Sequence, residues 1–129
     1  SRLGSAKIER TSAGVRYATI EGDPFGYPVL PAEMTMTQAL ECTFGSRYPD
    51  AIVQALQLFD SPRTGDLVVT AALDHDLRDR WEIPEHHGSH GSLHEEHMRI
   101  PLWSSRPILE NRPYRSIEAH DLMKHHLSF

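Results

Sequence analysis

The stretch YPDAIVQALQLFDSPRTGDLVVTAAL, residues 48–73, decides the predicted fold class. In its first half, apolar residues recur at helical spacing from Ile52 to Phe59, which predicts a helix over residues 49–60. Its second half, LVVTAAL, is an almost continuous apolar run rich in valine, which predicts a strand over residues 66–73 buried on both faces. A helix that leads into a buried strand is typical of an α/β sheet with crossover helices.

The sequence before this stretch predicts a hairpin and a short helix. KIERTSAGVRYATIE, residues 7–21, places β-branched and aromatic residues on both sides of a turn at Ala13-Gly14. After a loop rich in glycine and proline, residues 31–40 are compatible with a short helix. The N-terminal part of the chain is therefore expected to be a β-hairpin followed by helical structure.

The sequence after this stretch predicts a second core strand and a last helix. MRIPLWS, residues 98–104, has strand composition, with Pro101 typical of a sheet edge or a strand end. Ser116 is a suitable N-cap for a helix over residues 116–127. We therefore predict an α/β fold: one partial sheet that contains both core strands, flanking helices and an N-terminal β-hairpin, all in a single domain over residues 1–129.

The number of predicted strands bears on whether this domain is complete. Two core strands and one hairpin are fewer than a self-contained α/β sheet usually needs. The sequence therefore predicts either a part of a larger protein or a chain that dimerises to complete its sheet.

Composition excludes several classes of protein. Apolar residues make up 39% of the 129 residues, and the eight glycines bring this to roughly the 45% of globular chains, so the chain is not wholly disordered. The net charge of −5 argues against binding to a nucleic-acid backbone. No apolar run approaches the ~18 residues of a membrane span. Cys42 is the single cysteine, which excludes an internal disulfide.

Histidine is the unusual residue of this chain. There are nine histidines, and five of them lie within twelve positions: His86, His87, His90, His94 and His97. Imidazole is a common metal ligand and titrates near neutral pH. The cluster is either a set of ligands for a metal ion or a solvated polar loop.

Known zinc patterns do not match the histidine cluster. A zincin needs two histidines at i and i+4 with a glutamate between them, whereas His90 and His94 have no glutamate between them. A zinc finger needs cysteines that this chain lacks. What remains is the segment GSHGS, in which His90 stands between small residues that let the backbone turn sharply. His90 is therefore either one metal ligand or part of a solvated turn.

The run GDLVVTAAL, followed by a polar stretch and HHGSHGSLHEEHMRIPLWSS, resembles the C-terminal part of the alkaline phosphatase superfamily. The branch that it resembles most is that of the type I phosphodiesterases and nucleotide pyrophosphatases. In that branch a strand that begins with Gly-Asp leads to a Gly-x-His-Gly motif, a further strand and a final helix. Gly88-Ser89-His90-Gly91 matches the motif, and the resemblance extends roughly over residues 48–127.

The resemblance implies a function for a longer parent chain. Enzymes of this family hydrolyse phosphate esters or diesters with two metal ions, usually Zn²⁺, and a threonine or serine nucleophile. By the resemblance, His90 is the last histidine ligand of one of these ions. The nucleophile and the early aspartate ligands belong to the N-terminal part of the family, so this chain is expected to be a C-terminal fragment that is inactive alone. Its expected partners are the rest of the parent chain and the phosphoester substrate.

Other candidate residues have structural interpretations. Asp74-His75 is expected to be a surface loop, since the glycine that follows such a pair in the family is absent and His90 follows too soon. The four other histidines of the cluster are expected to orient or cover the site, or to be solvated. Cys42 is expected to be a buried thiol, and Thr35, Thr37 and Thr43 are expected to be structural rather than nucleophilic.

A second interpretation needs no resemblance. A small binding or interaction module with a histidine-rich loop would take up metal or respond to pH without catalysis. The two interpretations differ in whether further sequence precedes residue 1.

Overall fold

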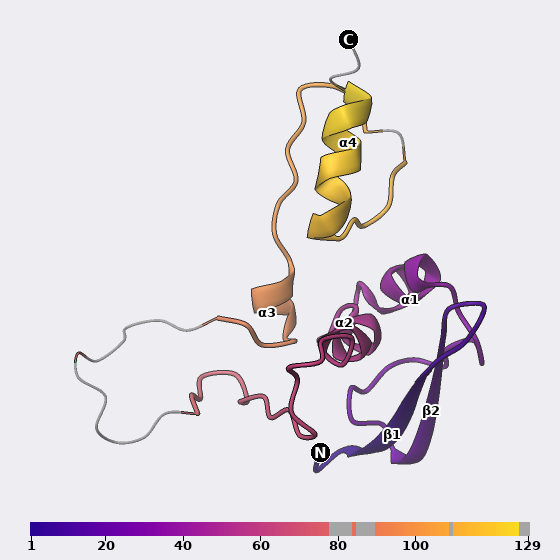
Figure 1. Ribbon diagram of the computed structural model, residues 1–129, viewed down its shortest axis with the longest axis vertical. Helices are drawn as coiled ribbons and strands as arrows, with labels where there is room; N and C mark the ends of the chain where they lie inside the picture. The colour runs from indigo at the N-terminus through magenta and orange to yellow at the C-terminus, as the bar shows by residue number, and fades with distance from the viewer. Residues whose placement is uncertain (78–83, 85–89, 109, 127–129) are drawn as a thin grey trace. The chain divides into compact units, whose positions relative to one another are not determined.

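The computed structural model of the chain is a mixed α/β structure and describes residues 1–77, 84, 90–108 and 110–126 (Figure 1). It forms two compact units, Ser1–Arg99 and Ile100–Phe129. In chain order the elements are β1 (Gly4–Arg10), β2 (Val15–Gly22), α1 (Met36–Thr43), α2 (Ala51–Leu58), α3 (Glu95–Met98), the 3-10 helix η1 (Ser116–Glu118) and α4 (Ala119–His126). No helix within the described ranges has the length and apolar character needed to cross a membrane.

The predicted N-terminal hairpin is confirmed. β1 and β2 pair antiparallel, with Ile8 opposite Tyr17 and Arg10 opposite Val15. Thr11 and Gly14 close the turn with reciprocal backbone hydrogen bonds of 3.0 and 3.3 Å. Because the turn residues and the alternating pattern lie next to each other in the sequence, local signals are sufficient to specify this element.

The chain after β2 returns to the hairpin beside its turn. Val15 and Met34 exchange two backbone hydrogen bonds of 2.8 and 2.9 Å, which form an isolated bridge. Gly14 has a φ of +146°, and a Cβ on it would lie 2.2 Å from the Met34 carbonyl oxygen. Glycine is therefore required here both by the backbone conformation and by the close approach of the returning chain.

Helices α1 and α2 correspond to the two helices expected before residue 61. α1 begins later than the predicted range of 31–40, because Thr35 is its N-cap: the Thr35 hydroxyl accepts from Gln38 N (3.1 Å), and Gln38 Oε1 accepts from Thr35 N (2.9 Å). This capping box satisfies two backbone donors at the helix start. α2 lies within the predicted range of 49–60, which confirms that helix.

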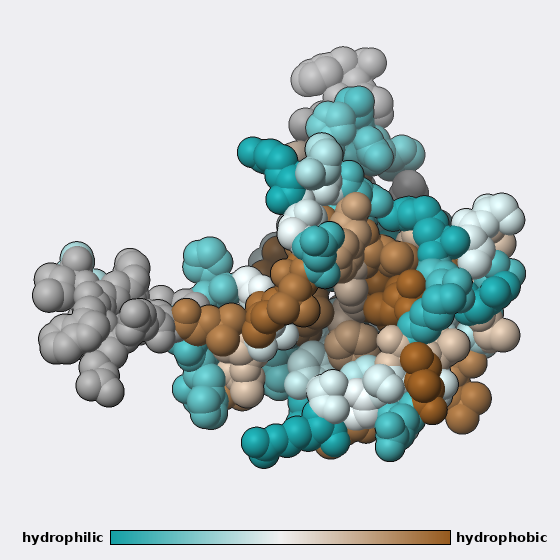
Figure 2. Space-filling model, turned by 60° about the horizontal axis from the view of Figure 1, so that its bottom comes forward, coloured by the Kyte–Doolittle hydropathy of each residue, from teal (hydrophilic) through white to brown (hydrophobic). Residues whose placement is uncertain are grey.

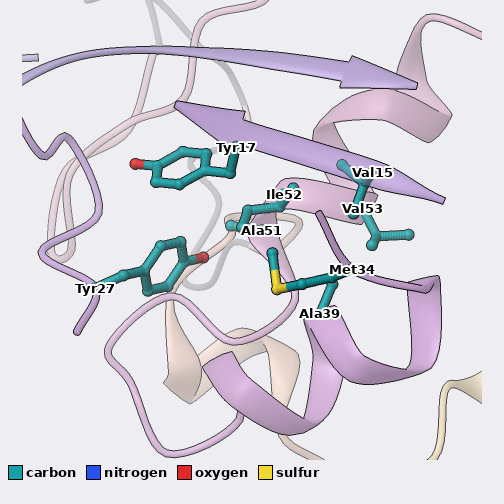
Figure 3. Packing of buried hydrophobic residues seen from close by; sticks show 8 residues of the cluster. All are labelled: Val15, Tyr17, Tyr27, Met34, Ala39, Ala51, Ile52 and Val53. Atoms are coloured by element: carbon teal, nitrogen blue, oxygen red, sulfur yellow. The ribbon is translucent and has the colours of Figure 1, made fainter. Parts of the chain in front are cut away.

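The hydrophobic core lies between the hairpin and the two helices. In Figure 3, Val15 and Tyr17 come from β2, and their side chains meet residues of α2. Met34 and Ala39 approach the same cluster from the chain before α1 and from α1 itself. The buried residues of the cluster are Val15, Tyr17, Tyr27, Met34, Ala39, Ala51, Ile52 and Val53. This core holds α2 against the hairpin.

Asp23 fixes the loop that follows the hairpin. Its Oδ1 accepts from the Tyr17 hydroxyl (2.7 Å), from Phe25 N (2.8 Å) and from Gly26 N (3.0 Å). Burial and the hydrogen bond to Asp23 raise the pKa of Tyr17 well above its usual value. The phenol therefore remains a hydrogen-bond donor throughout the physiological range.

The two predicted core strands are not strands in the structure, and the prediction of a larger sheet that contains them is wrong. The sheet found in the described ranges has two strands, β1 and β2. Residues 66–73 belong to no strand, and Leu67 is 80% exposed. In the range 98–104, Met98 ends α3 and Trp103 is 88% exposed. The physical reason is that a strand needs a neighbouring strand for its backbone groups, and the described chain supplies none to either segment.

These segments leave apolar side chains open to solvent. Figure 2 shows brown, hydrophobic residues exposed at the surface of the molecule. The large exposed apolar residues of the two segments are Leu67, Val68, Val69, Ile100, Leu102 and Trp103. Their apolar character, which suggested buried strands, is thus not accompanied by burial.

The last predicted helix is confirmed over residues 116–126, with η1 as its first turn and α4 as its body. Arg112 lies between two carboxylates, at 2.6 Å from Glu110 and 2.7 Å from Glu118, and its guanidinium stacks 4.0 Å from the Tyr114 ring centroid. Glu118 also accepts from Arg115 N at 2.7 Å. Burial acts to raise the pKa of Glu118, but the hydrogen bonds from Arg112 and the backbone outweigh it and lower that pKa.

Candidate functional site

His90, the predicted metal ligand, has an exposed side chain in the segment that leads to α3. Gly91 follows it with a φ of +91°, and a Cβ on Gly91 would have no neighbouring atom within 4 Å. The glycine therefore serves the backbone turn and is not required by close packing. The structure thus presents His90 to solvent directly before a glycine at positive φ.

A small pocket brings His90 together with residues from an earlier part of the chain. Its volume is about 180 Å³. It is lined by residues 69–77 and by His90, Gly91, Ser92 and His97. The prediction that Asp74-His75 is an exposed loop is confirmed. The same two residues also line the pocket together with His90.

The Asp74-His75 turn has a defined local structure. Asp74 adopts a φ of +62°, in the left-handed region that aspartate tolerates better than most residues. The Nδ1 of His75 lies 2.8 Å from the Leu73 carbonyl oxygen, so this nitrogen donates and carries the proton when the ring is neutral. The Nε2 of His75 is then the nitrogen that remains available as an acceptor or ligand.

The described residues do not by themselves form a metal site. Zinc in proteins takes three or four ligands from histidine, cysteine and carboxylate side chains. Among residues 1–77, 84, 90–108 and 110–126, no three such side chains gather closely enough to hold a metal ion. His86 and His87, which were expected to orient or cover the site, lie outside the described residues. His90 offers one imidazole on an accessible loop.

His94 has a structural role that the sequence analysis did not identify. It is the N-cap of α3, and its Nδ1 accepts from Glu96 N at 3.4 Å. Its ring meets the Tyr48 ring edge to face, with centroids 5.8 Å apart. The two acidic residues directly after His94 were a local signal for a helix start, because carboxylates favour the first turn.

The connection between α1 and α2 holds the segment that carries His94. Glu95 N donates to the Arg47 carbonyl oxygen at 2.8 Å. The Arg99 guanidinium donates to the carbonyl oxygens of Phe44 (2.6 Å) and Ser46 (3.1 Å). These contacts join residues about fifty positions apart, so no local sequence pattern predicts them.

Thr43 and Cys42 were considered as possible nucleophiles in the sequence. Thr43 is fully buried, donates to the Ala39 carbonyl oxygen (2.6 Å) and accepts from Asp50 N (2.9 Å), which confirms its structural role. Cys42 is exposed, so the expectation of a buried thiol is wrong. Because α1 turns its Ala39–Leu40–Thr43 face toward the core, Cys42 falls on the other face.

Comparison of the chain with protein-family models, curated proteins and solved structures finds no match. The resemblance to the alkaline phosphatase superfamily thus rests on the motif residues, above all on Gly88-Ser89-His90-Gly91. It stays a prediction, and so does the zinc ligand that it implies.

Proposed function

We propose that this chain is the C-terminal portion of a metal-dependent phosphodiesterase or phosphatase of the alkaline phosphatase superfamily. In this proposal it contributes His90 as one metal ligand and forms part of the substrate cleft. It is inactive alone, because the nucleophile and the aspartate ligands come from the rest of the parent chain.

The observation that supports this proposal is the position of His90. The side chain is exposed, precedes Gly91 in the segment that leads to α3, and lines a pocket together with Asp74 and His75. An accessible imidazole on a loop is the kind of donor that a two-metal phosphoester site uses. Carboxylate and imidazole groups next to it are suited to orient a ligand or a bound water.

The proposed metal ions are Zn²⁺, and His90 would hold one of them through a ring nitrogen. When bound, such ions stabilise the charge that develops on the attacking and leaving oxygens during phosphoryl transfer.

The experiment compares His90→Ala with neighbouring variants in the parent polypeptide. Zinc content by elemental analysis and steady-state hydrolysis of a chromogenic phosphodiester are measured for each variant. His90→Ala should lower both together, because the lost ligand leaves the metal incompletely held. His97→Ala should lower them less, and His120→Ala, an exposed histidine of the C-terminal unit, should leave both unchanged. Full zinc and full rate in His90→Ala would contradict the proposal.

The chain alone provides a second test. Purified residues 1–129 should not hydrolyse the same phosphodiester, because they supply neither nucleophile nor a complete metal site in this proposal. Chelator-sensitive turnover by the purified chain would show that it carries an active site of its own. Firm zinc binding without turnover would instead favour the histidine-rich binding module.

A further inference from the structure

Arg99 connects the segment that carries His90 to the α1–α2 connection through several contacts of one side chain. Its Nη2 donates to the carbonyl oxygens of Phe44 and Ser46, at 2.6 and 3.1 Å. Its Nη1 lies 2.6 Å from Glu95 Oε2, one helical turn earlier in α3. The guanidinium carbon lies 5.3 Å from the centroid of the Phe44 ring, within cation–π range. A planar group with five donors can serve all these partners at once.

The same segment is held at three further points between His90 and Arg99. Leu93 packs against the hydrophobic core. The His94 ring contacts the Tyr48 ring, and Glu95 N donates to the Arg47 carbonyl oxygen. Residues 93–99 are therefore fixed to a connection that itself follows a core helix. His90 lies only three residues before the first of these contacts.

The loop between His90 and Leu93 leads directly into this attached segment. Gly91 has a φ of +91°, and a Cβ on it would have no atom within 4 Å, so the loop is open on that side. A metal site holds its ligands within about 0.5 Å of the required geometry, which needs support from neighbouring groups. On the C-terminal side of His90, the anchored segment provides such support.

We infer that Arg99 is a positioning residue for the proposed metal site: by clamping α3 to the α1–α2 connection, it fixes the backbone from which His90 projects. This inference rests on the proposed function, because it concerns the placement of the same ligand. Arg99 does not touch the metal in this arrangement, and its effect is transmitted through residues 93–98.

The test compares Arg99→Gln, Arg99→Lys and a matched control. Arg10→Gln is the control, because Arg10 also reaches across the same unit, to Asp60 at 2.8 and 2.9 Å, but contacts neither α3 nor its anchor. Two quantities are measured: the exchange rate of the Glu95 amide in residues 1–129, by NMR, and the Zn²⁺ dissociation constant of the parent polypeptide, by chelator competition. The Arg99 side chain is 37% exposed and lies outside the core, so the variants should remain folded.

Arg99→Gln should speed exchange of the Glu95 amide and raise the Zn²⁺ dissociation constant about 10-fold, the lower end for groups that orient metal ligands. Arg99→Lys keeps the charge beside Glu95 but cannot span two carbonyls. Its amide exchange rate and its Zn²⁺ dissociation constant should therefore lie between those of Arg99→Gln and those of the unchanged protein. Arg10→Gln should change neither quantity.

The outcomes separate this inference from the proposed function. If His90→Ala weakens Zn²⁺ binding but Arg99→Gln binds as tightly as Arg10→Gln, the positioning role is overturned and the proposed ligand stands. If His90→Ala leaves binding unchanged, the proposed function fails first. If Arg99→Gln does not fold, Arg99→Lys decides: Zn²⁺ binding equal to that of Arg10→Gln overturns the inference.

Discussion

Two regions of the Ser1–Arg99 unit both contain valine and other apolar residues, but one is packed in the core and the other is exposed. In β2, Val15 is fully buried and belongs to the core. In residues 66–73, Val69 is 60% exposed and belongs to no strand. Valine has the same β preference in both places, so composition does not explain the difference. A strand also needs a partner for its backbone and a layer to cover its apolar face.

The backbone hydrogen bonds explain the difference. β2 has β1 along one edge and meets Met34 at its start. Residues 66–73 make one backbone hydrogen bond within the described ranges, from His75 N to the Ala72 carbonyl oxygen at 3.0 Å. An apolar segment in this state exposes both hydrophobic surface and unpaired backbone groups, and such surfaces usually mark a site of association.

The largest expected effect comes from truncating the core. Ile52 is fully buried, so Ile52→Ala should reduce the free energy of unfolding by about 2–5 kcal/mol. Val69→Ala is the control from the exposed region and should cost less than about 0.5 kcal/mol. Urea denaturation followed by circular dichroism measures both. Equal losses of unfolding free energy in Ile52→Ala and Val69→Ala would contradict the distinction between a buried and an exposed region.

The turn between β1 and β2 tests whether the chain that returns at Met34 packs on the hairpin. Gly14→Ala should cost about 1–3 kcal/mol, because alanine disfavours the positive φ and its Cβ would collide with the Met34 carbonyl. Gly45→Ala is the matched control: Gly45 is not at positive φ, and a Cβ there would have no neighbour within 4 Å. The shift in denaturation midpoint is the measurement. A Gly14 variant as stable as the Gly45 variant would mean that the returning chain does not pack on the turn.

The start of α1 tests the helical side of the core. Thr35→Ala removes the hydroxyl of the capping box and should cost about 1 kcal/mol. Thr37→Ala changes the same residue type at an exposed position inside the helix, where alanine is the better helix former. Thermal unfolding should therefore separate the two variants in opposite directions. A destabilised Thr37 variant beside a neutral Thr35 variant would contradict the assigned helix start.

The smallest expected effect concerns the Ile100–Phe129 unit, in which none of the residues with a described burial is buried and Arg112 forms ion pairs with Glu110 and Glu118. The pKa of Glu118 is lowered in the folded state, so its contribution is present above its ordinary pKa of 4.5 and is lost as pH falls through the lowered value. Acid should therefore release Arg112 and the Arg115 amide that donates to Glu118. The Arg115 amide signal in an NMR pH titration reports this step. Glu118→Gln should remove the pH dependence of this signal. If the variant keeps the same acid transition, a group other than Glu118 is responsible for it.

The elements that the sequence predicted are those whose contacts are close in sequence. The hairpin needs a turn at Gly14 and alternation on either side of it, and both are local patterns. α2 and the helix over residues 116–126 follow from apolar spacing and terminal signals, because helical hydrogen bonds join residues four positions apart.

Tertiary structure decided the features that depend on distant residues. Whether residues 66–73 become a strand depends on a neighbouring strand, about which their own composition says nothing. The pocket shared by His75 and His90, and the clamp from Arg99 to Phe44, join segments that lie 15 and 55 positions apart. Local patterns determine which backbone conformations are favourable, whereas the partners of exposed backbone groups and side chains are determined only when the chain folds back on itself.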